Sequence, residues 1–113
     1  MRAIPEEIIQ QAIIWRREIH ARPEIGLQEF HTSAKISSLL REYDLAVHTG
    51  IAGTGVIGVL RNGEGPAIAL RADIDALPIQ ESNVIDWCST APGMMHACGH
   101  DGHSAILLGA ARY

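Results

Sequence analysis

The stretch MHACGHDGHS, at residues 95–104, gathers side chains that can bind a metal ion or transfer a proton. It contains three of the six histidines and one of the two cysteines in the 113-residue chain. Cys98 and His100 lie two residues apart, so their side chains point the same way in an extended segment but not in a helix. At a strand end or in a loop, this thiolate and this imidazole can bind one cation, such as Zn²⁺, Mn²⁺, Co²⁺ or Ni²⁺.

Three further residues of this stretch have candidate roles in the same site. His96 has the same two-residue spacing and is a candidate third donor, and His103, in the first turn of the next helix, is a candidate pocket-lining residue. Asp101 either caps that helix or accepts a hydrogen bond from a metal-binding imidazole. Two other chemistries stay open: a cysteine nucleophile with a histidine base, and a structural zinc site, whose second pair of ligands is missing.

The stretch LRADIDALP, at residues 70–78, is the second candidate. Asp73 and Asp75 are again two residues apart, and they follow a predicted strand. Ligands bind at the carboxyl ends of strands in sheets that helices cover, which favours a site here. Alternatively, one aspartate starts a turn ahead of Pro78, and Arg71 is either a residue at the edge of the core or an ion-pair partner.

Two helices are predicted in the first half of the chain. The first covers residues 5–20, where an apolar stripe repeats at spacings of three and four residues. Its members are Ile8, Ala12, Trp15 and Ile19. The RREIHARPE stretch at residues 16–24 is interpreted as the end of this helix with a polar cluster. A second helix is expected from about residue 27 to residue 43, with its apolar side formed by Ala34, Leu39 and Leu40.

Two strands are predicted after these helices, at residues 55–61 (GVIGVLR) and 66–72 (PAIALRA). NGEG, at residues 62–65, is expected to join them as a tight hairpin. The nearly continuous apolar run at residues 67–70 is typical of a strand that is covered on both faces. The preceding GTGVIG run is interpreted as a glycine-rich entry to a strand, because it fits no nucleotide-binding motif.

A last helix is predicted over residues 102–113, with Asp101 as its N-cap. Its apolar residues, Ile106, Leu107 and Leu108, need a partner surface, and no C-cap glycine follows them. We therefore expect that the chain is cut within a domain.

The composition is that of an ordinary globular protein, with 47% hydrophobic and 19% charged residues. The net charge is −4 and the nine cationic residues are scattered, which argues against nucleic-acid binding. No apolar stretch reaches the ~18 residues of a membrane span, and the N-terminus lacks the pattern of a signal peptide. Two cysteines make no disulfide framework, so we expect a reduced, cytoplasmic protein.

Four motifs taken together resemble a known family. They are RREIHARPEIGLQEF, GIAGTGVIGVL, IALRADIDALPIQE and PGMMHACGHDGHSAILLGAA. In order and spacing they are similar to the opening third of the M20 metallopeptidase superfamily, over roughly residues 16–111. The similarity is greatest to its amidohydrolase branch, which includes hippurate hydrolases, N-acyl-amino-acid amidohydrolases and hydrolases of indole-acetic-acid–amino-acid conjugates. It implies an α/β fold, a zinc-exopeptidase-like sandwich, of which residues 1–113 are the N-terminal portion without the lid or dimerisation domain.

The resemblance also implies a site and a reaction. Cys98, in a bridging role, and His100 correspond to the first two ligands of a centre of two divalent ions, and Asp75 corresponds to a catalytic aspartate beside it. The motif places four more residues in the pocket or in hydrogen-bonding positions around the ligands: His96, Asp101, His103 and Asp73. The implied reaction is hydrolysis of the amide bond of N-acyl amino acids by a metal-activated water. The implied partners are this small-molecule substrate and further copies of the parent enzyme, with neither nucleic acid nor membrane.

One part of the family's machinery has no counterpart in this sequence. The general-base glutamate belongs to a Glu-Glu pair that should come after the MHACGHD motif, as should the remaining metal ligands. We therefore expect that these 113 residues alone do not hydrolyse an N-acyl amino acid. The alternatives are a truncated, non-catalytic remnant and a small metal-binding module.

Overall fold

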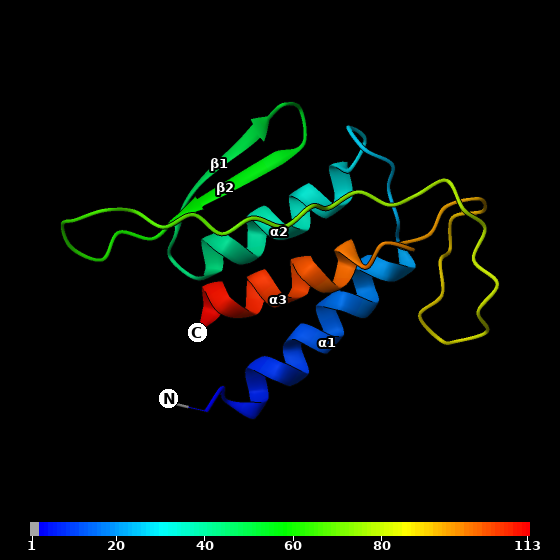
Figure 1. The fold of residues 1–113 in the computed structure, drawn as a ribbon, viewed down its shortest axis with the longest axis horizontal. Coiled ribbons are helices and arrows are strands. Elements are labelled where there is room, and N and C mark those ends of the chain that lie inside the picture. The colour runs from blue at the N-terminus through cyan, green and yellow to red at the C-terminus, as the bar shows by residue number, and fades with distance from the viewer. Residues whose placement is uncertain (1–2) are drawn as a thin grey trace.

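Three helices and one β-hairpin make up the regular structure of the chain (Figure 1). The computed structural model describes residues 3–113, so residues 1–2 of the predicted domain lie outside the described part. In chain order the elements are α1 (Glu6–Ala21), α2 (Phe30–Glu42), β1 (Ala46–Ile51), β2 (Gly55–Val59) and α3 (His100–Arg112). None of the described helices is long and apolar enough to cross a membrane.

Helix α1 confirms the first predicted helix. Pro5 is its N-cap residue, which suits a proline because the first amides of a helix have no intrahelical partner. Ile8, Trp15 and Ile19 of the predicted apolar stripe are buried, and Ala12 is half-buried. The period of the apolar residues therefore identified both this helix and the face that packs on the core.

Helix α2 begins at Phe30, three residues later than predicted. The chain turns before it at Leu27, whose φ of 68° is left-handed. Leu40 is buried and Leu39 half-buried, as predicted, but Ala34 is exposed, so its predicted place on the packed side is wrong. Six residues separate Ala34 from Leu40, which places their side chains about 120° apart around a helix.

The hairpin differs from the predicted one. The strand predicted at residues 55–61 is present as β2, but its antiparallel partner is β1, and residues 66–72 are neither strand nor helix. NGEG is therefore not a hairpin turn. Ile68 is 90% exposed and Leu70 is 68% exposed, which contradicts a strand covered on both faces. A strand needs a hydrogen-bonded neighbour, and within residues 3–113 no strand lies beside this segment.

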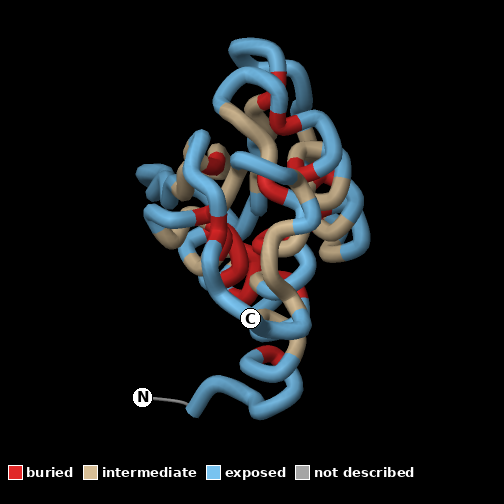
Figure 2. Tube along the Cα trace, turned by 90° about the vertical axis from the view of Figure 1, so that its right-hand side faces the viewer, coloured by how far each residue is buried: buried red, intermediate tan, exposed pale blue. Residues whose placement is uncertain are grey.

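The core lies where the three helices and the hairpin meet. Helix α3 lies between α1 and α2, and the hairpin lies over α2 (Figure 1). Four buried side chains form the centre of this core: Trp15, Leu40, Ala105 and Leu108. Figure 2 shows the buried stretches gathered in the middle of the molecule, with exposed loops around them.

Residues 60–99 connect β2 to α3 without a helix or a regular strand. Two isolated bridges hold this segment, a parallel one between Ile25 and Ala76 and an antiparallel one between Leu77 and Met95. The backbone amides of Leu77 and Met95 donate to each other's carbonyls at 2.9 and 3.0 Å. These bridges bring the end of the ADID motif beside the start of the MHACGHD motif.

Candidate functional site

Helix α3 begins at His100, within the MHACGHD motif. Gly99 is its N-cap, with a left-handed φ of 83°, and no side chain caps the first turn. Asp101 therefore lies inside the first turn, and its prediction as the N-cap is wrong. The left-handed glycine turns the chain into the helix earlier, at His100. Cys98 precedes this turn as an exposed free thiol.

His100 and Asp75 form a hydrogen-bonded pair. The Nδ1–H of His100 donates to Asp75 Oδ1 at 2.9 Å and lies 3.0 Å from the Asp75 carbonyl oxygen. In the neutral ring this leaves the lone pair of Nε2 for a ligand. Metal-binding histidines usually have this arrangement, with the second nitrogen bonded to a carboxylate or a carbonyl. The structure thus brings together two of the predicted residues in an orientation that fits a metal ligand.

The remaining predicted residues surround this pair in different ways. His103 is exposed, with its ring centroid 5.9 Å from that of His100. The carbonyl of Asp73 accepts a hydrogen bond from Ser104 Oγ at 3.1 Å, which fastens α3 to the ADID motif. The Asp73 carboxylate forms an ion pair with Arg71, so the ion-pair interpretation of Arg71 is the one that the structure supports.

His96 does not join Cys98 and His100 as a third donor. Within residues 3–113 no three His, Cys, Asp or Glu side chains gather in a geometry that holds a metal ion. His96 is 4% exposed, and neither of its ring nitrogens has a hydrogen-bond partner. Burial lowers the pKa of His96, and the charges of Asp101 and Asp75 only partly oppose this effect. The His96 imidazole is therefore buried, and its neutral form is favoured.

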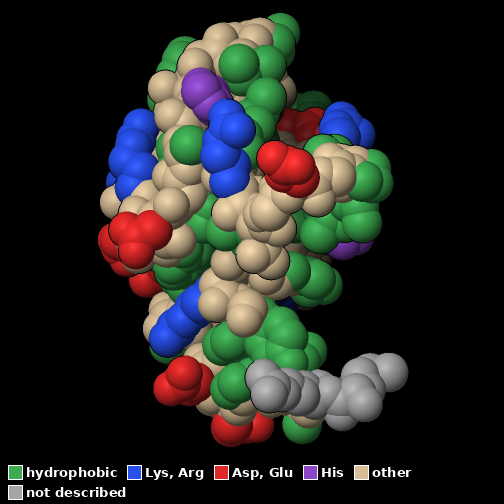
Figure 3. Space-filling view, turned by 90° about the vertical axis from the view of Figure 1, so that its left-hand side faces the viewer, with side chains coloured by type: hydrophobic (Ala, Val, Ile, Leu, Met, Phe, Trp, Pro, Cys, Tyr) green, Lys and Arg blue, Asp and Glu red, His purple; other side chains and the backbone are tan. Residues whose placement is uncertain are grey.

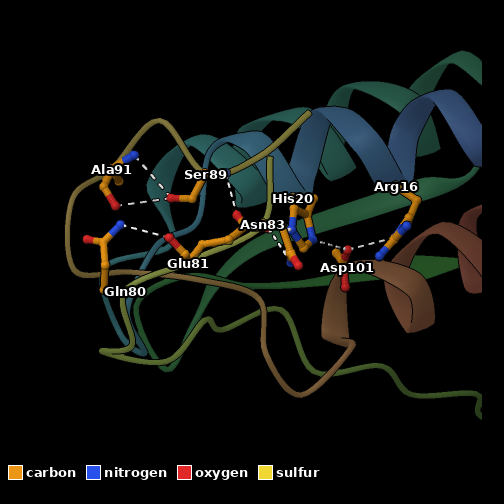
Figure 4. A network of polar contacts seen from close by, with 8 residues as sticks. All are labelled: Arg16, His20, Gln80, Glu81, Asn83, Ser89, Ala91 and Asp101. Carbon is orange, nitrogen blue, oxygen red and sulfur yellow. Dashed lines mark hydrogen bonds and ion pairs between the residues drawn. The ribbon is translucent and has the colours of Figure 1, made fainter. Parts of the chain in front are cut away.

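A buried polar network lies next to these residues (Figure 4). Asp101 is 0% exposed, and its Oδ2 accepts hydrogen bonds from His20 Nδ1 at 2.8 Å and Arg16 Nε at 2.9 Å. The other nitrogen of His20, Nε2, lies 3.1 Å from Glu81 Oε1. Glu81 also accepts from the backbone amide of Ser89 at 2.5 Å. Asp101 therefore accepts its imidazole hydrogen bond from His20 and not from a predicted ligand.

The network keeps both carboxylates ionised. The Ser89 amide, together with Asn83 and His20, lowers the pKa of Glu81 to about 2. Burial alone would raise the pKa of Asp101, but the hydrogen bond from His20 and the charge of Arg16 outweigh it, so that this pKa is lowered. Two buried negative charges are thus compensated by cationic and amide donors from α1 and the loop at residues 79–90.

The RREIHARPE stretch was interpreted as the end of a helix with a polar cluster, and two of its residues also belong to the buried network. Arg16 and His20 lie four residues apart, so they share one side of α1, beside the apolar stripe. This spacing is a local signal for a shared contact, whereas nothing near Glu81 in the sequence indicates its partner. Glu24 accepts hydrogen bonds from the amides of His31 and Thr32 at 2.9 and 2.7 Å. It thereby caps the first turn of α2 from outside the helix.

A groove lies elsewhere on the surface of the molecule. An apolar groove of about 850 Å³ runs between α1 and α3, and its lining includes Ile8, Ile13, Ala105 and Ile106. Figure 3 shows hydrophobic side chains at the surface of the face that lies on the left in Figure 1. Cys98, His100 and Asp75 do not line this groove. The candidate site is therefore the group of residues around Asp75 and His100.

In this α/β chain a carboxylate orients a histidine that follows an exposed cysteine by two positions in the sequence, and a histidine held in this way suits a metal site. Residues 69–113 match the family model described as Peptidase family M20/M25/M40. The chain is 48% identical over 106 residues to IAA-amino acid hydrolase ILR1-like 2 of Arabidopsis thaliana, covering 94% of this chain and 24% of that protein. It is 46% identical over 99 residues to hippurate hydrolase of Campylobacter jejuni, covering 87% of this chain and 26% of that protein.

Comparison with solved structures also shows a similarity to the M20 family. The YxeP protein of Bacillus subtilis, described as a dinuclear metal binding peptidase from the M20 family, matches with a TM-score of 0.89 and 41% identity. The match covers 96% of this chain and 31% of that one. The predicted resemblance to the M20 family and the α/β fold class are thus confirmed. The chain spans about a quarter of the length of the curated relatives that it matches.

Proposed function

We propose that the chain is the N-terminal part of the catalytic domain of a metal-dependent amidohydrolase that cleaves N-acyl amino acids. The observation that carries this proposal is the hydrogen bond from His100 Nδ1 to Asp75. His100 lies two residues after Cys98, whose thiol is exposed. The names of the relatives, IAA-amino acid hydrolase and hippurate hydrolase, support an N-acyl amino acid as the small-molecule substrate.

The metal ligands in this proposal are the Cys98 thiolate and the His100 Nε2 atom. A thiolate and an imidazole suit Mn²⁺, Zn²⁺, Co²⁺ or Ni²⁺, with the thiolate favouring the softer ions. The complete site of the proposed enzyme holds two ions, and the YxeP relative is described as dinuclear. When bound, such ions supply a water of lowered pKa and polarise the carbonyl of the amide.

The residues of this chain orient and surround those ligands. Asp75 holds the His100 ring through Nδ1 and makes Nε2 a better donor. His103 lies beside His100 and is exposed, whereas His96 is buried. No residue here is assigned as the general base, so the chain alone is expected to bind metal without turnover. Homo-oligomerisation remains a prediction from the resemblance, and a cytoplasmic location remains a prediction from the cysteine content.

Co²⁺ binding tests the proposed ligands. Titration of the purified chain with Co²⁺ should produce the near-ultraviolet absorption of a thiolate–Co²⁺ bond. Cys98→Ser should abolish this absorption, and His100→Gln should weaken binding at least tenfold. Cys88→Ser is the matched control, because Cys88 lies outside the site and its loss should change nothing. An absorption that survives Cys98→Ser, or that disappears with Cys88→Ser, contradicts the proposal.

An amidase assay tests the expectation that the chain alone does not hydrolyse N-acyl amino acids. The chain should show no hydrolysis of hippurate or N-acetyl amino acids above the buffer rate with Mn²⁺ or Zn²⁺ present. Metal-dependent turnover that Cys98→Ser removes would show that the chain alone contains a complete site. If Zn²⁺ addition instead converts an unfolded chain into a folded one, the chain is a small metal-binding module.

A further inference from the structure

His20 joins three segments that are far apart in the sequence. It lies in the last turn of α1 and is 3% exposed. Its Nδ1 lies 2.8 Å from Asp101 in α3, and its Nε2 lies 3.1 Å from Glu81 in the loop at residues 79–90. Both acceptors are carboxylates, so each of the two ring nitrogens faces a carboxylate oxygen. His20 therefore bridges two carboxylates.

Both carboxylates of this bridge also accept hydrogen bonds from other residues. Arg16 Nε donates to Asp101 at 2.9 Å from one turn earlier in α1. Glu81 accepts from the Ser89 amide at 2.5 Å and from Asn83 Nδ2 at 3.0 Å. All of these partners belong to α1 or to the loop, and Figure 4 shows Arg16 and His20 at Asp101, with Ser89 and Asn83 around Glu81 on the far side of His20.

This bridge sets the rotation of α3 about its own axis. Asp101 directly follows His100, and consecutive residues of a helix point about 100° apart. A fixed Asp101 side chain therefore fixes the direction in which His100 leaves the helix. The start of α3 is also fastened by His100 to Asp75 and by Ser104 to the Asp73 carbonyl.

We propose that His20 is a positioning residue that holds the first turn of α3 so that His100 donates through Nδ1 to Asp75 and presents Nε2 to a metal ion. This inference rests on the proposed function, in which His100 is a ligand. Asp101 transmits the effect, because it is the neighbour of His100 and the acceptor of His20. Arg16 and Glu81 support the bridge from either end.

The test compares His20→Gln with the unmodified chain by two measurements. Long-range ¹H–¹⁵N NMR of the imidazoles, without metal, reports which nitrogen of His100 carries the proton. Titration with Co²⁺ reports the affinity of the site. The glutamine amide carries both of its N–H donors on one nitrogen, whereas the imidazole faces the two carboxylates with two separate nitrogens, so the bridge should be lost and the Nδ1–H form of His100 should lose population. The Co²⁺ dissociation constant should rise about tenfold, as is usual when the support of a ligand is removed.

Control variants distinguish a positioning role of His20 from a general loss of folded structure. His48→Gln, at an exposed position of β1, should leave the His100 signals and the Co²⁺ affinity unchanged. If His20→Gln does not fold, Glu81→Gln takes its place and should produce a smaller change in the same direction. A folded variant whose His100 signals and Co²⁺ affinity stay within twofold of the unmodified chain overturns the inference. If the unmodified chain binds no Co²⁺, the proposed function fails, whereas the NMR comparison still decides whether His20 positions His100.

Discussion

Single hydrogen bonds decide what the predicted residues of this chain can do. Asp75 and His100 are 25 residues apart, and each was a candidate on its own before the structure paired them. The pairing assigns Nδ1 of His100 to a carboxylate and Nε2 to a ligand. His96, four residues earlier in the same motif, has no such partner and remains buried. Neighbouring histidines of one motif thus differ in role because of the residues that they contact.

Glu81 should make the stability of the chain dependent on acid. Its folded pKa of about 2 lies below its ordinary value of 4.5, so the unfolded chain binds the proton first. The stability that Glu81 contributes is therefore complete above a pH of about 4.5 and is lost as the pH falls toward about 2. At neutral pH, Glu81→Gln should lower the free energy of unfolding by about 3 kcal/mol, since it leaves His20 without one carboxylate.

Urea unfolding at a series of pH values measures this effect. The difference in free energy between the unmodified chain and Glu81→Gln should shrink as the pH falls through the stated range. Glu64→Gln, at an exposed position, is the control and should follow the unmodified chain at each pH. A difference that stays constant with pH would show that Glu81 is not ionised in the folded chain under these conditions.

Gly99 forms the boundary at which α3 begins, between the two proposed ligands Cys98 and His100. Its left-handed φ of 83° is the turn between Cys98 and the first residue of α3. A Cβ added there would meet no atom within 4 Å, so alanine costs only the backbone strain. Gly99→Ala should therefore lower the free energy of unfolding by about 1–2 kcal/mol, the usual cost of the left-handed conformation for a residue with a side chain. Thermal and urea unfolding followed by circular dichroism measure it.

Gly102 is the matched control for this change. It lies three residues later inside α3, and a Cβ there would also meet nothing within 4 Å. Its φ is not left-handed, so alanine should raise helix stability by up to about 1 kcal/mol. Opposite signs for the two glycines are expected. Equal effects would mean that the turn at Gly99 does not need its observed conformation.

Elements that depend on distant partners were predicted less well than α1. The apolar run at residues 67–70 has the composition of a buried strand, yet Ile68 is 90% exposed because no described strand pairs with it. Asp101 has a side chain suited to an N-cap, yet it does not occupy that position, because Gly99 is the N-cap and the Asp101 carboxylate accepts from His20. In both cases a tertiary partner, or its absence, outweighs local preference.

The whole molecule depends on a small core. Trp15 is 3% exposed and packs with Leu40, Ala105 and Leu108, and its ring lies 6.4 Å from that of Tyr43. Trp15→Ala should lower the free energy of unfolding by about 3–5 kcal/mol through lost burial and the cavity that remains. This is a large part of the total stability of an ordinary domain, which is about 5–15 kcal/mol. Urea unfolding followed by far-ultraviolet circular dichroism measures the loss.

A neighbouring residue provides the comparison. Ile14 precedes Trp15 in α1 but points outward and is 48% exposed. Ile14→Ala should change the free energy of unfolding by less than about 0.5 kcal/mol, as surface substitutions usually do. Similar losses at the two positions would contradict a core centred on Trp15.

The sequence by itself determined α1, the core face of that helix, the strand at β2 and the two motifs that carry the candidate site. These features depend on spacings of a few residues, and such spacings reflect helix and strand geometry directly. Only the tertiary structure decided that Asp75 orients His100, that His20 joins Asp101 to Glu81, and that residues 66–72 form no strand. These contacts join residues that are 25 to 81 positions apart. Local pattern does not specify such contacts, because they form only when packing brings the segments together.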